Sequence, residues 1–384
     1  ELTDHRGVDA PRHPLGPLPP PPSLSGDGRA VPRVESLTGL RWFAAIGVVL
    51  THFALPDAAP AWARTLGANG FLGVPFFFTL SGYVLTARYA GAWTGLADYS
   101  RRRFWRIAPL YWIAFAAGWV LLQHSPRVDR YAVVHVLGLQ AWLPNVGDVF
   151  AYNGPGWTIS VEIVLYALFP ALLRPVLARP SGPRDGLRYL AAGFAMALAF
   201  GGVILLLPTS DPQVASDLAR WLLRMPVAHV STFVIGMGVA MVTMPRAHRP
   251  SGALAASLQV VALGGAIVVL STMPPRASHL SMVIVDSIGA AIGSGIVIGA
   301  CAAAPSSPIS RLLASRPMIL LGSASYAVYL LHMPVMHALR GLTLPLQLGY
   351  PTRIAILTLL AIALHRWIEQ PLYRRFAAPS ARLR

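Results

Sequence analysis

Apolar runs of about 20 residues recur along this chain from Leu37 to Trp367, separated by short loops that hold much of the charge. A run of that length is what an α-helix needs to cross the hydrocarbon core of a bilayer. Of the 384 residues, 55% are hydrophobic and only 12% are charged, whereas a soluble domain has about twice that charged share. The pattern therefore predicts an all-α integral membrane protein.

Ten of the apolar runs are long enough to span a bilayer. The predicted spans are Leu37–Pro56, Asn69–Tyr89, Phe104–Gln123, Trp157–Leu177, Leu187–Leu207, Val227–Met244, Leu254–Thr272, Leu280–Cys301, Met318–Leu339 and Pro351–Ile368. Between the third and fourth lies Tyr131–Leu143, which has about 13 residues and is too short to span. We therefore expect a bundle of about ten transmembrane helices with one short re-entrant or interfacial helix.

The membrane domain is expected to cover residues 34–376, with a tail on either side. Residues 1–33 are polar and proline-rich, which predicts a disordered or extended cytoplasmic tail. They contain no apolar stretch of the signal-peptide kind. Residues 377–384 are expected to form a short cytoplasmic C-terminal tail.

The net charge of +16 suggests a nucleic-acid binder at first sight, but its distribution favours a membrane protein. All 31 basic residues are arginine. With the N-terminus in the cytoplasm, 23 of them fall on the inner side and 8 on the outer side. Positive charge collects in cytoplasmic loops, so both termini are expected in the cytoplasm and the protein in the plasma membrane. Making Tyr131–Leu143 an eleventh span would largely cancel the asymmetry.

Sequence motifs for several common sites are absent. The single cysteine, Cys301, lies in an apolar stretch, so the chain has no intrachain disulfide and no cysteine metal site. Neither a glycine loop for phosphate nor a cluster of metal ligands occurs. We expect no metal, no nucleic-acid partner, and a chemistry carried by the polar residues inside the membrane.

The first predicted span carries Arg41 and His52. Eleven residues make about three helical turns, so both side chains project from one face, about 16 Å apart. Ionisable residues inside a membrane are costly and often functional. Arg41 is either an interfacial anchor or a binding group, and His52 is either a packing residue or a reactive one.

Ser81 lies in the second span, and Arg103 and Arg106 lie near the start of the third. Ser81 with Gly82 is typical of close helix packing, and as a nucleophile Ser81 would need a neighbouring base. Arg103 and Arg106 share a helix face. They are either positive-inside anchors or a pair able to bind a phosphate.

The fourth span opens with Trp157, Ser160 and Glu162, and Tyr166 follows one turn later. A carboxylate five residues into an apolar helix is hard to explain by packing, and the alternative is a structural partner for an arginine or a histidine. It is therefore a candidate for a catalytic role.

In the ninth span, Ser325, Tyr329 and His332 follow i, i+4, i+7 spacing and share a face, next to Tyr326. The alternative to a reactive site is a hydrogen-bonded stripe between helices. His229 and His365 have no polar pattern around them, and we interpret both as structural.

The helix rise places three groups at one depth. At about 1.5 Å per residue, His52 lies about 22 Å and His332 about 21 Å above the inner ends of their spans. Glu162 lies about 7 Å below the outer end of its span, again about 22 Å up in a core roughly 30 Å thick. These three are expected at one level in the outer half. The basic groups are expected at or near the inner face: Arg41, Arg103 and Arg106.

Taken together and in order, these residues resemble the acyltransferase-3 family of integral membrane O-acyltransferases. The resemblance runs from about Val34 to Phe376. It rests on Arg41 and His52, Phe77-Phe78-x-x-Ser81-Gly82, Arg103-x-x-Arg106, Trp157-x-x-Ser160-x-Glu162, Ser325-Tyr326-x-x-Tyr329-Leu330-x-His332 and Glu369-x-Pro371. Family members acylate surface polysaccharides, lipopolysaccharide, peptidoglycan, Nod factors and macrolides. Some carry a fused hydrolase-like domain that has no counterpart in these 384 residues, so the membrane domain would complete the transfer or pass the acyl group to a partner.

The resemblance implies a cytosolic acyl-CoA donor, with an acetyl or other short acyl group, and a hydroxyl acceptor on a sugar, glycan or macrolide. Arg41, Arg103 and Arg106 would lie near the donor's phosphates. His52 would be the general base, since an imidazole titrates near neutral pH, and Glu162 would orient it or act as the base itself.

The remaining candidates are substrate or oxyanion contacts. They are Ser81, Trp157, Ser160, Tyr166, Tyr326 and Tyr329, while His332, which could also stabilise the oxyanion, is the third catalytic candidate beside His52 and Glu162. A transporter that uses the polar midplane residues as a substrate or proton path is the main alternative function, and a structural scaffold is a third. Acceptor identity, acyl chain length and oligomeric state are left open by the sequence.

Overall fold

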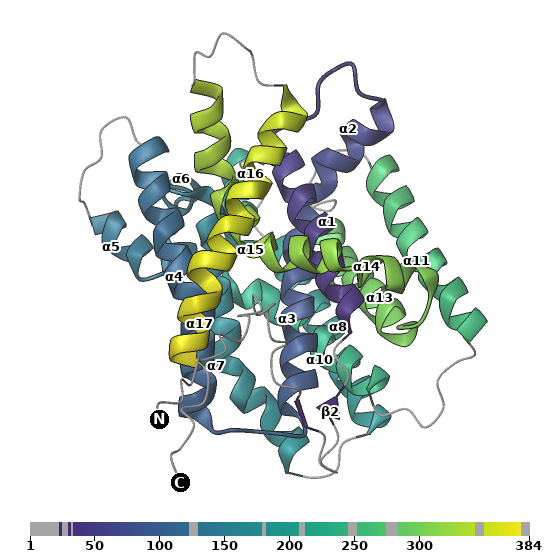
Figure 1. Cartoon of the computed structure of the whole chain (residues 1–384). Coiled ribbons are helices and arrows are strands. Elements are labelled where there is room, and N and C mark those ends of the chain that lie inside the picture. Colours follow the sequence, from purple (N-terminus) through teal and green to yellow (C-terminus); the bar gives the residue numbers. More distant parts are fainter. Residues whose placement is uncertain are drawn as a thin grey trace, which may run out of the picture.

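The computed structural model describes residues 23–24, 30–31, 34–122, 130–178, 182–206, 212–244, 252–273, 283–341 and 349–377. In this part of the chain the long helices run along a common direction and form one bundle (Figure 1). Two short antiparallel strands, β1 (Ser23–Leu24) and β2 (Ala30–Val31), lie next to α3. The predicted all-α membrane bundle is confirmed.

The helices follow one another along the chain with short connections. In order they are α1 (Glu35–His52), α2 (Ala61–Ala68), η1 (Asn69–Leu72), α3 (Gly73–Tyr89), α4 (Leu96–Leu122), α5 (Arg130–Val136), η2 (Gln140–Trp142), α6 (Val146–Val149), η3 (Gly154–Gly156), α7 (Trp157–Leu177), α8 (Pro183–Leu205), α9 (Pro212–Leu222), η4 (Pro226–His229), α10 (Val230–Thr243), α11 (Gly252–Thr272), η5 (Val283–Gly289), α13 (Ala290–Ala303), α14 (Pro308–Leu313), α15 (Arg316–Gly341), α16 (Tyr350–Leu364), η6 (His365–Glu369) and α17 (Gln370–Ala377).

Nine helical stretches of the described residues are long and apolar enough to cross a membrane. They correspond to the second to tenth predicted spans. The first predicted span is α1, whose 18 residues include Glu35, Arg41 and His52 and are therefore less apolar. It is placed inside the bundle by its packing against α15, α3 and η1.

The third span begins earlier than expected. Helix α4 starts at Leu96 rather than at Phe104, so the arginine run lies inside the helix instead of before it. The reason is local: Arg101 and Arg102 each bind the Asp98 carboxylate at 2.6 Å, one helical turn away. These ion pairs neutralise charge that would otherwise disfavour the helix.

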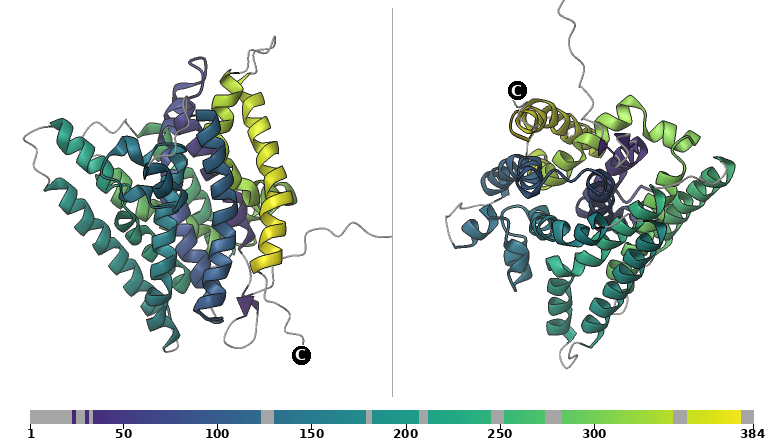
Figure 2. Two further views of the ribbon diagram at one scale, coloured as in Figure 1. Left: turned by 90° about the vertical axis from the view of Figure 1, so that its left-hand side faces the viewer. Right: turned by 90° about the horizontal axis from the view of Figure 1, so that it is seen from below.

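The segment between α4 and α7 does not span, as predicted. Its described part is a set of short helices, α5, η2, α6 and η3, that packs beside the upper part of α4 and ahead of α7 (Figures 1 and 2). The Tyr111 hydroxyl of α4 donates to the His135 carbonyl oxygen of α5. Most of the predicted N-terminal tail and all but the first residue of the predicted C-terminal tail lie outside the described residues.

Helix α10 is the most buried of the candidate spans. It packs against α3 through glycines that let two backbones touch, because a Cβ on Gly236 would lie 1.9 Å from the Thr79 carbonyl oxygen and one on Gly82 would lie 2.1 Å from that of Phe233. Gly82 therefore has the packing role that its small size suggested. The neighbouring Ser81 side chain faces α7 instead, where it contacts Tyr166.

Helices α1 and α15 meet in the same way, and this contact is testable. A Cβ on Gly322 would lie 1.7 Å from the Thr38 carbonyl oxygen, so Gly322→Ala must push the two helices apart. We expect it to destabilise the protein by about 1–3 kcal/mol, as overpacking does. Thermal unfolding in detergent measures this, with Gly264→Ala in α11 as the control, since Gly264 has no neighbour within 4 Å. Equal unfolding midpoints for the two variants would contradict the close packing.

Candidate active site

Two histidines meet where the end of α1 lies beside the second half of α15. The close packing of α1 on α15 brings His52, the last residue of α1, to within 3.3 Å of His332, measured from Nδ1 of His52 to Nε2 of His332. The ring centroids are 5.0 Å apart. His332 is completely buried, whereas His52 is exposed. The expected common level of these two histidines is confirmed.

Three arginines and two carboxylates form a second group, which we call the arginine cluster: Arg41, Arg103, Arg106, Glu162 and Glu369. Glu162 is within electrostatic range of all three arginines. Arg106 forms a salt bridge with Glu369. The buried Nε atom of Arg103 has no hydrogen-bond partner among the described residues. The cluster therefore contains more positive than negative charge and a donor group available to an anion.

The arginine run of α4 divides by helical face. Arg101 and Arg102 turn to Asp98. Arg103 lies over the Tyr166 ring of α7 at 5.8 Å, and Arg106 lies over the Tyr326 ring of α15 at 5.6 Å. The i, i+3 pair that the sequence singled out is thus the pair that faces the centre of the bundle.

The expected depth of Glu162 is wrong, because it lies with the arginines and not beside His52. That expectation assumed that α7 begins at the outer surface. Instead, the Pro155 carbonyl oxygen just before α7 accepts a hydrogen bond from the Tyr329 hydroxyl at 3.3 Å, so α7 begins below His332. The short helices that precede α7 occupy the space above it. Glu162 therefore lies lower in the bundle than the sequence suggested.

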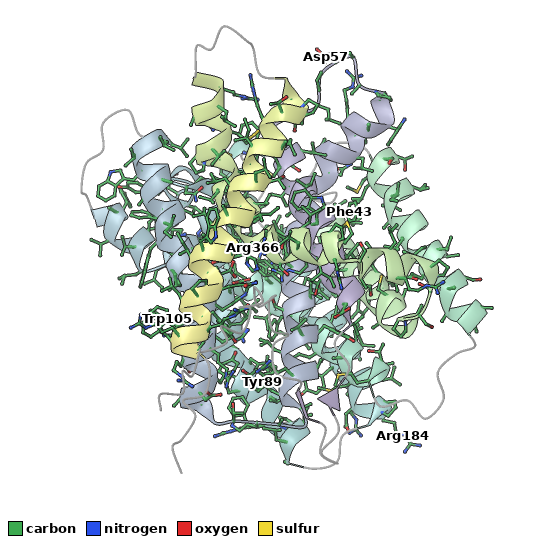
Figure 3. The ribbon with its side chains drawn as sticks, in the orientation of Figure 1. Phe43, Asp57, Tyr89, Trp105, Arg184 and Arg366 are labelled. Atoms are coloured by element: carbon green, nitrogen blue, oxygen red, sulfur yellow. The ribbon has the colours of Figure 1, made fainter. Side chains whose placement is uncertain are left out.

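The arginines are also deeper in the protein than expected. The Tyr326 hydroxyl donates to the Ile107 carbonyl oxygen at 3.0 Å, which places Arg106 at the level of Tyr326. Tyr326 is six residues before His332, so the cluster lies only about 9 Å below the histidine pair. Figure 3 shows the exposed residues Phe43 and Arg366 about halfway along the height of the bundle. The cluster therefore occupies an interior layer and not the inner face.

Tyrosines connect the two groups. Tyr166, Tyr326 and Tyr329 are all within electrostatic range of Glu162. The Ser81 side chain contacts the Tyr166 hydroxyl. At the upper end, the Tyr329 ring lies 6.0 Å from the His332 ring. Polar side chains thus lie at successive levels between the arginine cluster and the histidine pair, and we call the whole set the polar column.

Two predicted site residues are used elsewhere. The buried Ser160 hydroxyl accepts from the Ala141 backbone N–H at 3.1 Å and pairs with the Gln140 side chain, so it anchors η2. The Trp157 ring packs 5.5 Å from His229 and 6.4 Å from Phe78. Neither of these contacts is to the arginine cluster or the histidine pair.

Sequence reasoning missed His365 and Glu369 as site residues. The Nδ1 atom of His365 lies 2.8 Å from Glu369, whose carboxylate also meets Arg106. Gln370 donates to Nε2 of His365 at 2.9 Å. These residues lie at η6, a π-helical turn, and such turns often occur at functional sites. The i, i+4 spacing of His365 and Glu369 could have identified this pair, because Glu369 already belonged to the Glu369-x-Pro371 motif.

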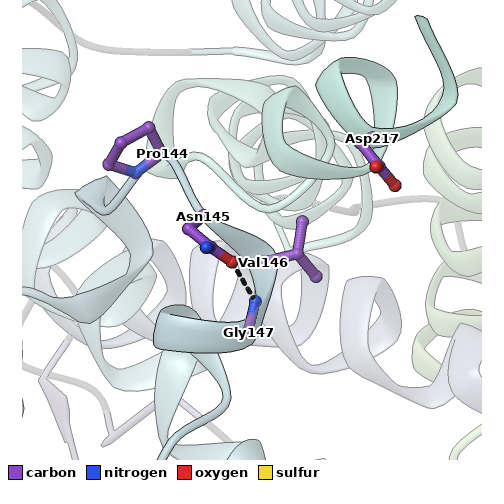
Figure 4. A pocket seen from close by; sticks show the side chains of 5 residues that line it. All are labelled: Pro144, Asn145, Val146, Gly147 and Asp217. Atoms are coloured by element: carbon purple, nitrogen blue, oxygen red, sulfur yellow. Dashed lines mark hydrogen bonds between the residues drawn. The ribbon is translucent and has the colours of Figure 1, made fainter. Parts of the chain in front are cut away.

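A surface pocket lies apart from this column. It is lined by Pro144, Asn145, Val146, Gly147 and Asp217, between the α6 region and α9 (Figure 4). The only hydrogen bond drawn there is local, from the Gly147 N–H to the Asn145 side chain. None of the predicted site residues lines this pocket, so it offers no support for chemistry at the polar column.

Comparison with known proteins gives the family. A family model described as an acyltransferase domain, acyltransferase-3, matches residues 34–365. The acyltransferase MdmB of Streptomyces mycarofaciens is 29% identical over 90% of this chain and 92% of its own length. No solved structure matches the chain.

Two further relatives are longer proteins. The O-acetyltransferase OatA of Staphylococcus aureus is 24% identical over 89% of this chain. The peptidoglycan O-acetyltransferase OatA of Listeria monocytogenes is 23% identical over 88% of it. This chain covers only 57% and 56% of their lengths. With a family model matched over most of its residues and nine candidate membrane-spanning helices in the described part, the chain belongs to the acyltransferase-3 family of multi-pass membrane proteins.

Proposed function

We propose that this protein is a membrane-bound O-acyltransferase that moves a short acyl group, most simply acetyl, from acyl-CoA to a hydroxyl of a sugar, a surface glycan or a macrolide-type metabolite. The observation that carries the proposal is the polar column, in which an arginine-rich layer lies about 9 Å below a histidine pair. The phosphates of acyl-CoA suit the arginine end of this column, and its long thin pantetheine arm suits the distance to the histidine end.

The lower end supports an anionic donor. Arginine is the residue best suited to phosphate, because its planar guanidinium carries several fixed donors. Arg41, Arg103 and Arg106 would hold the phosphates of coenzyme A, and Glu162 and Glu369 would limit the repulsion between the arginines when the donor is absent. The pantetheine arm would extend past Tyr326 and Tyr329 and present the thioester to His52.

The upper end supports acid–base chemistry. A hydroxyl becomes a competent nucleophile when a base removes its proton as it attacks. His52 is exposed and adjoins a second histidine, whereas Glu162 is surrounded by arginines. We therefore assign the general base to His52 and a charge-balancing role to Glu162. The Tyr329 hydroxyl is the candidate contact for the developing oxyanion.

The acceptor is proposed at the level of class only. The Listeria relative is named for peptidoglycan, but this chain covers little more than half of that protein. The MdmB relative, matched over nearly its whole length, is named only as an acyltransferase. A hydroxylated sugar is common to the proposed acceptors, whether it stands alone, in a glycan or on a macrolide.

A direct assay tests the proposed function. Purified protein is incubated with acyl-labelled acetyl-CoA, and free thiol release is measured with and without candidate glycan or macrolide acceptors. Mass spectrometry of glycans and small metabolites from cells with and without the gene identifies the acylated product. A transporter would move substrate into vesicles without consuming acyl-CoA, and that outcome would replace the proposal.

The membrane orientation is proposed with both termini in the cytoplasm and is tested by labelling. Asp57 and Arg184 lie at opposite ends of the bundle (Figure 3). In intact cells, a membrane-impermeant thiol reagent should label Asp57→Cys at once and Arg375→Cys only after permeabilisation, since both positions are exposed. Native Cys301 is buried and gives little background. Labelling of Arg375→Cys in intact cells would reverse the orientation.

A further inference from the structure

The hydrogen bonds of the histidine pair fix where its protons lie. Nδ1 of His52 is 2.9 Å from the Val48 carbonyl oxygen, one turn back in α1. A carbonyl oxygen only accepts, so Nδ1 of His52 carries a proton. By the same reasoning Nδ1 of His332, 2.6 Å from the Tyr329 carbonyl oxygen, also carries one. A neutral histidine with its proton on Nδ1 has a lone pair on Nε2.

Each ring therefore has a definite orientation toward the other. Nε2 of His332, with its lone pair, lies 3.3 Å from Nδ1–H of His52. The His52 proton is shared between the Val48 carbonyl oxygen and the His332 nitrogen. The other ring nitrogen of His52, Nε2, keeps its lone pair and has no partner among the described residues. This is the arrangement that a general base requires.

We infer that His332 is a positioning residue for His52: it holds the proton of His52 on Nδ1 and so keeps Nε2 available as the base. The inference rests on the proposed acyl transfer and extends it. The acceptor O–H proton passes to Nε2 of His52 while the acceptor oxygen bonds to the thioester carbon. The C–S bond then breaks, and the same proton moves from Nε2 to the departing thiolate sulfur.

The surroundings of His332 keep the transferred proton on His52. His332 is completely buried, and no carboxylate contacts it among the described residues. Its ring neighbours are Phe53, with centroids 6.3 Å apart, and Tyr329. Moving a full charge into that position is costly, so His332 accepts a hydrogen bond from the His52 imidazolium without taking its proton. In this respect it resembles the residue that orients the base in other base-activated nucleophile systems.

Two substitutions separate positioning from packing. His332→Leu removes the hydrogen-bond acceptor Nε2 and introduces an apolar side chain of comparable size, whereas His332→Gln provides an acceptor oxygen in its place. We expect His332→Leu to lower kcat by about 10–100-fold, as the loss of an orienting outer partner does, with the KM for acyl-CoA unchanged. His332→Gln should recover most of the wild-type kcat. A folded His332→Leu protein with wild-type kcat, or a His332→Gln protein as slow as His332→Leu, would overturn the inference.

A measurement without substrate keeps this inference distinct from the proposed function. In ¹⁵N-histidine-labelled protein, the signals absent from His52→Gln identify His52, and their shifts report which ring nitrogen is protonated. Wild type should show His52 protonated on Nδ1, and His332→Leu should show a mixture with the Nε2-protonated form. If acyl transfer is absent but this spectrum is found, the proposed function fails and the histidine geometry stands. An Nε2-protonated His52 in wild type would overturn the positioning role itself.

Discussion

Replacing His52 with Gln is expected to lower kcat for acyl transfer by about 10²–10⁴-fold, the usual contribution of a general base. The amide can still donate to the Val48 carbonyl oxygen and to His332, which are the partners of His52, but it cannot take the acceptor proton. The Kd of acyl-CoA should stay within a few-fold of wild type, because the proposed phosphate contacts lie further down the bundle. Thiol release gives kcat, and calorimetric titration gives Kd.

His337 provides the matched control for that substitution. It too is an exposed histidine whose Nδ1 lies 2.9 Å from the carbonyl oxygen one turn back, that of Met333. Among the described residues it makes no hydrogen bond to His332, so His337→Gln should leave kcat unchanged. If both variants lose activity equally, general disturbance of this end of the bundle explains the loss. If His52→Gln is folded and turns over normally, His52 is not the base, and Glu162 and His332 remain as candidates.

The sequence predicted the helices well because the bilayer imposes one simple requirement. Runs of apolar residues locate the spans, and Trp157–Leu177 was predicted with the same bounds as α7. The early start of α4 was missed, since a run of arginines looks like a loop until Asp98 is recognised as their partner one turn away. Hydropathy averages charge and does not detect such local pairing.

The candidate site was only partly predictable. Helical spacing placed Tyr329 and His332 on one face of α15, and it placed Arg103 and Arg106 on one face of α4. Depth was harder, because it depends on where a helix begins relative to the membrane. The short helices before α7 displace that start, and no pattern within α7 reveals it. The salt bridge of Glu369 with Arg106 joins η6 to α4, so it depends on tertiary packing that the sequence does not display.

The arginine layer yields the second large effect. Arg103 and Arg106 of α4 should each contribute a charge-assisted contact to phosphate worth about 1.5–3 kcal/mol. If the contributions add, replacing both Arg103 and Arg106 with Ala should weaken acyl-CoA binding by about 10²–10⁴-fold. Titration of the purified variant with coenzyme A measures the change in Kd.

Removing Arg106 alone would leave the buried Glu369 carboxylate without its salt-bridge partner, which is strongly destabilising. The Arg106→Ala change is therefore best combined with Glu369→Gln, so that affinity is compared between folded proteins. Arg103 has no salt bridge among the described residues, and Arg103→Ala needs no such compensation. Thermal unfolding of each variant verifies the fold before binding is interpreted.

Arg101 is the control that separates phosphate binding from general positive charge. It lies in the same run of α4 but binds Asp98 at 2.6 Å, away from the cluster. We expect Arg101→Ala to leave the Kd of coenzyme A nearly unchanged. An acyl-pantetheine donor, which lacks the nucleotide phosphates, should react equally with wild type and Arg103→Ala. If Arg101→Ala weakens binding as much as Arg103→Ala, or if acyl-pantetheine shows the same loss, these arginines act through the surface charge or the fold and the phosphate site must lie elsewhere.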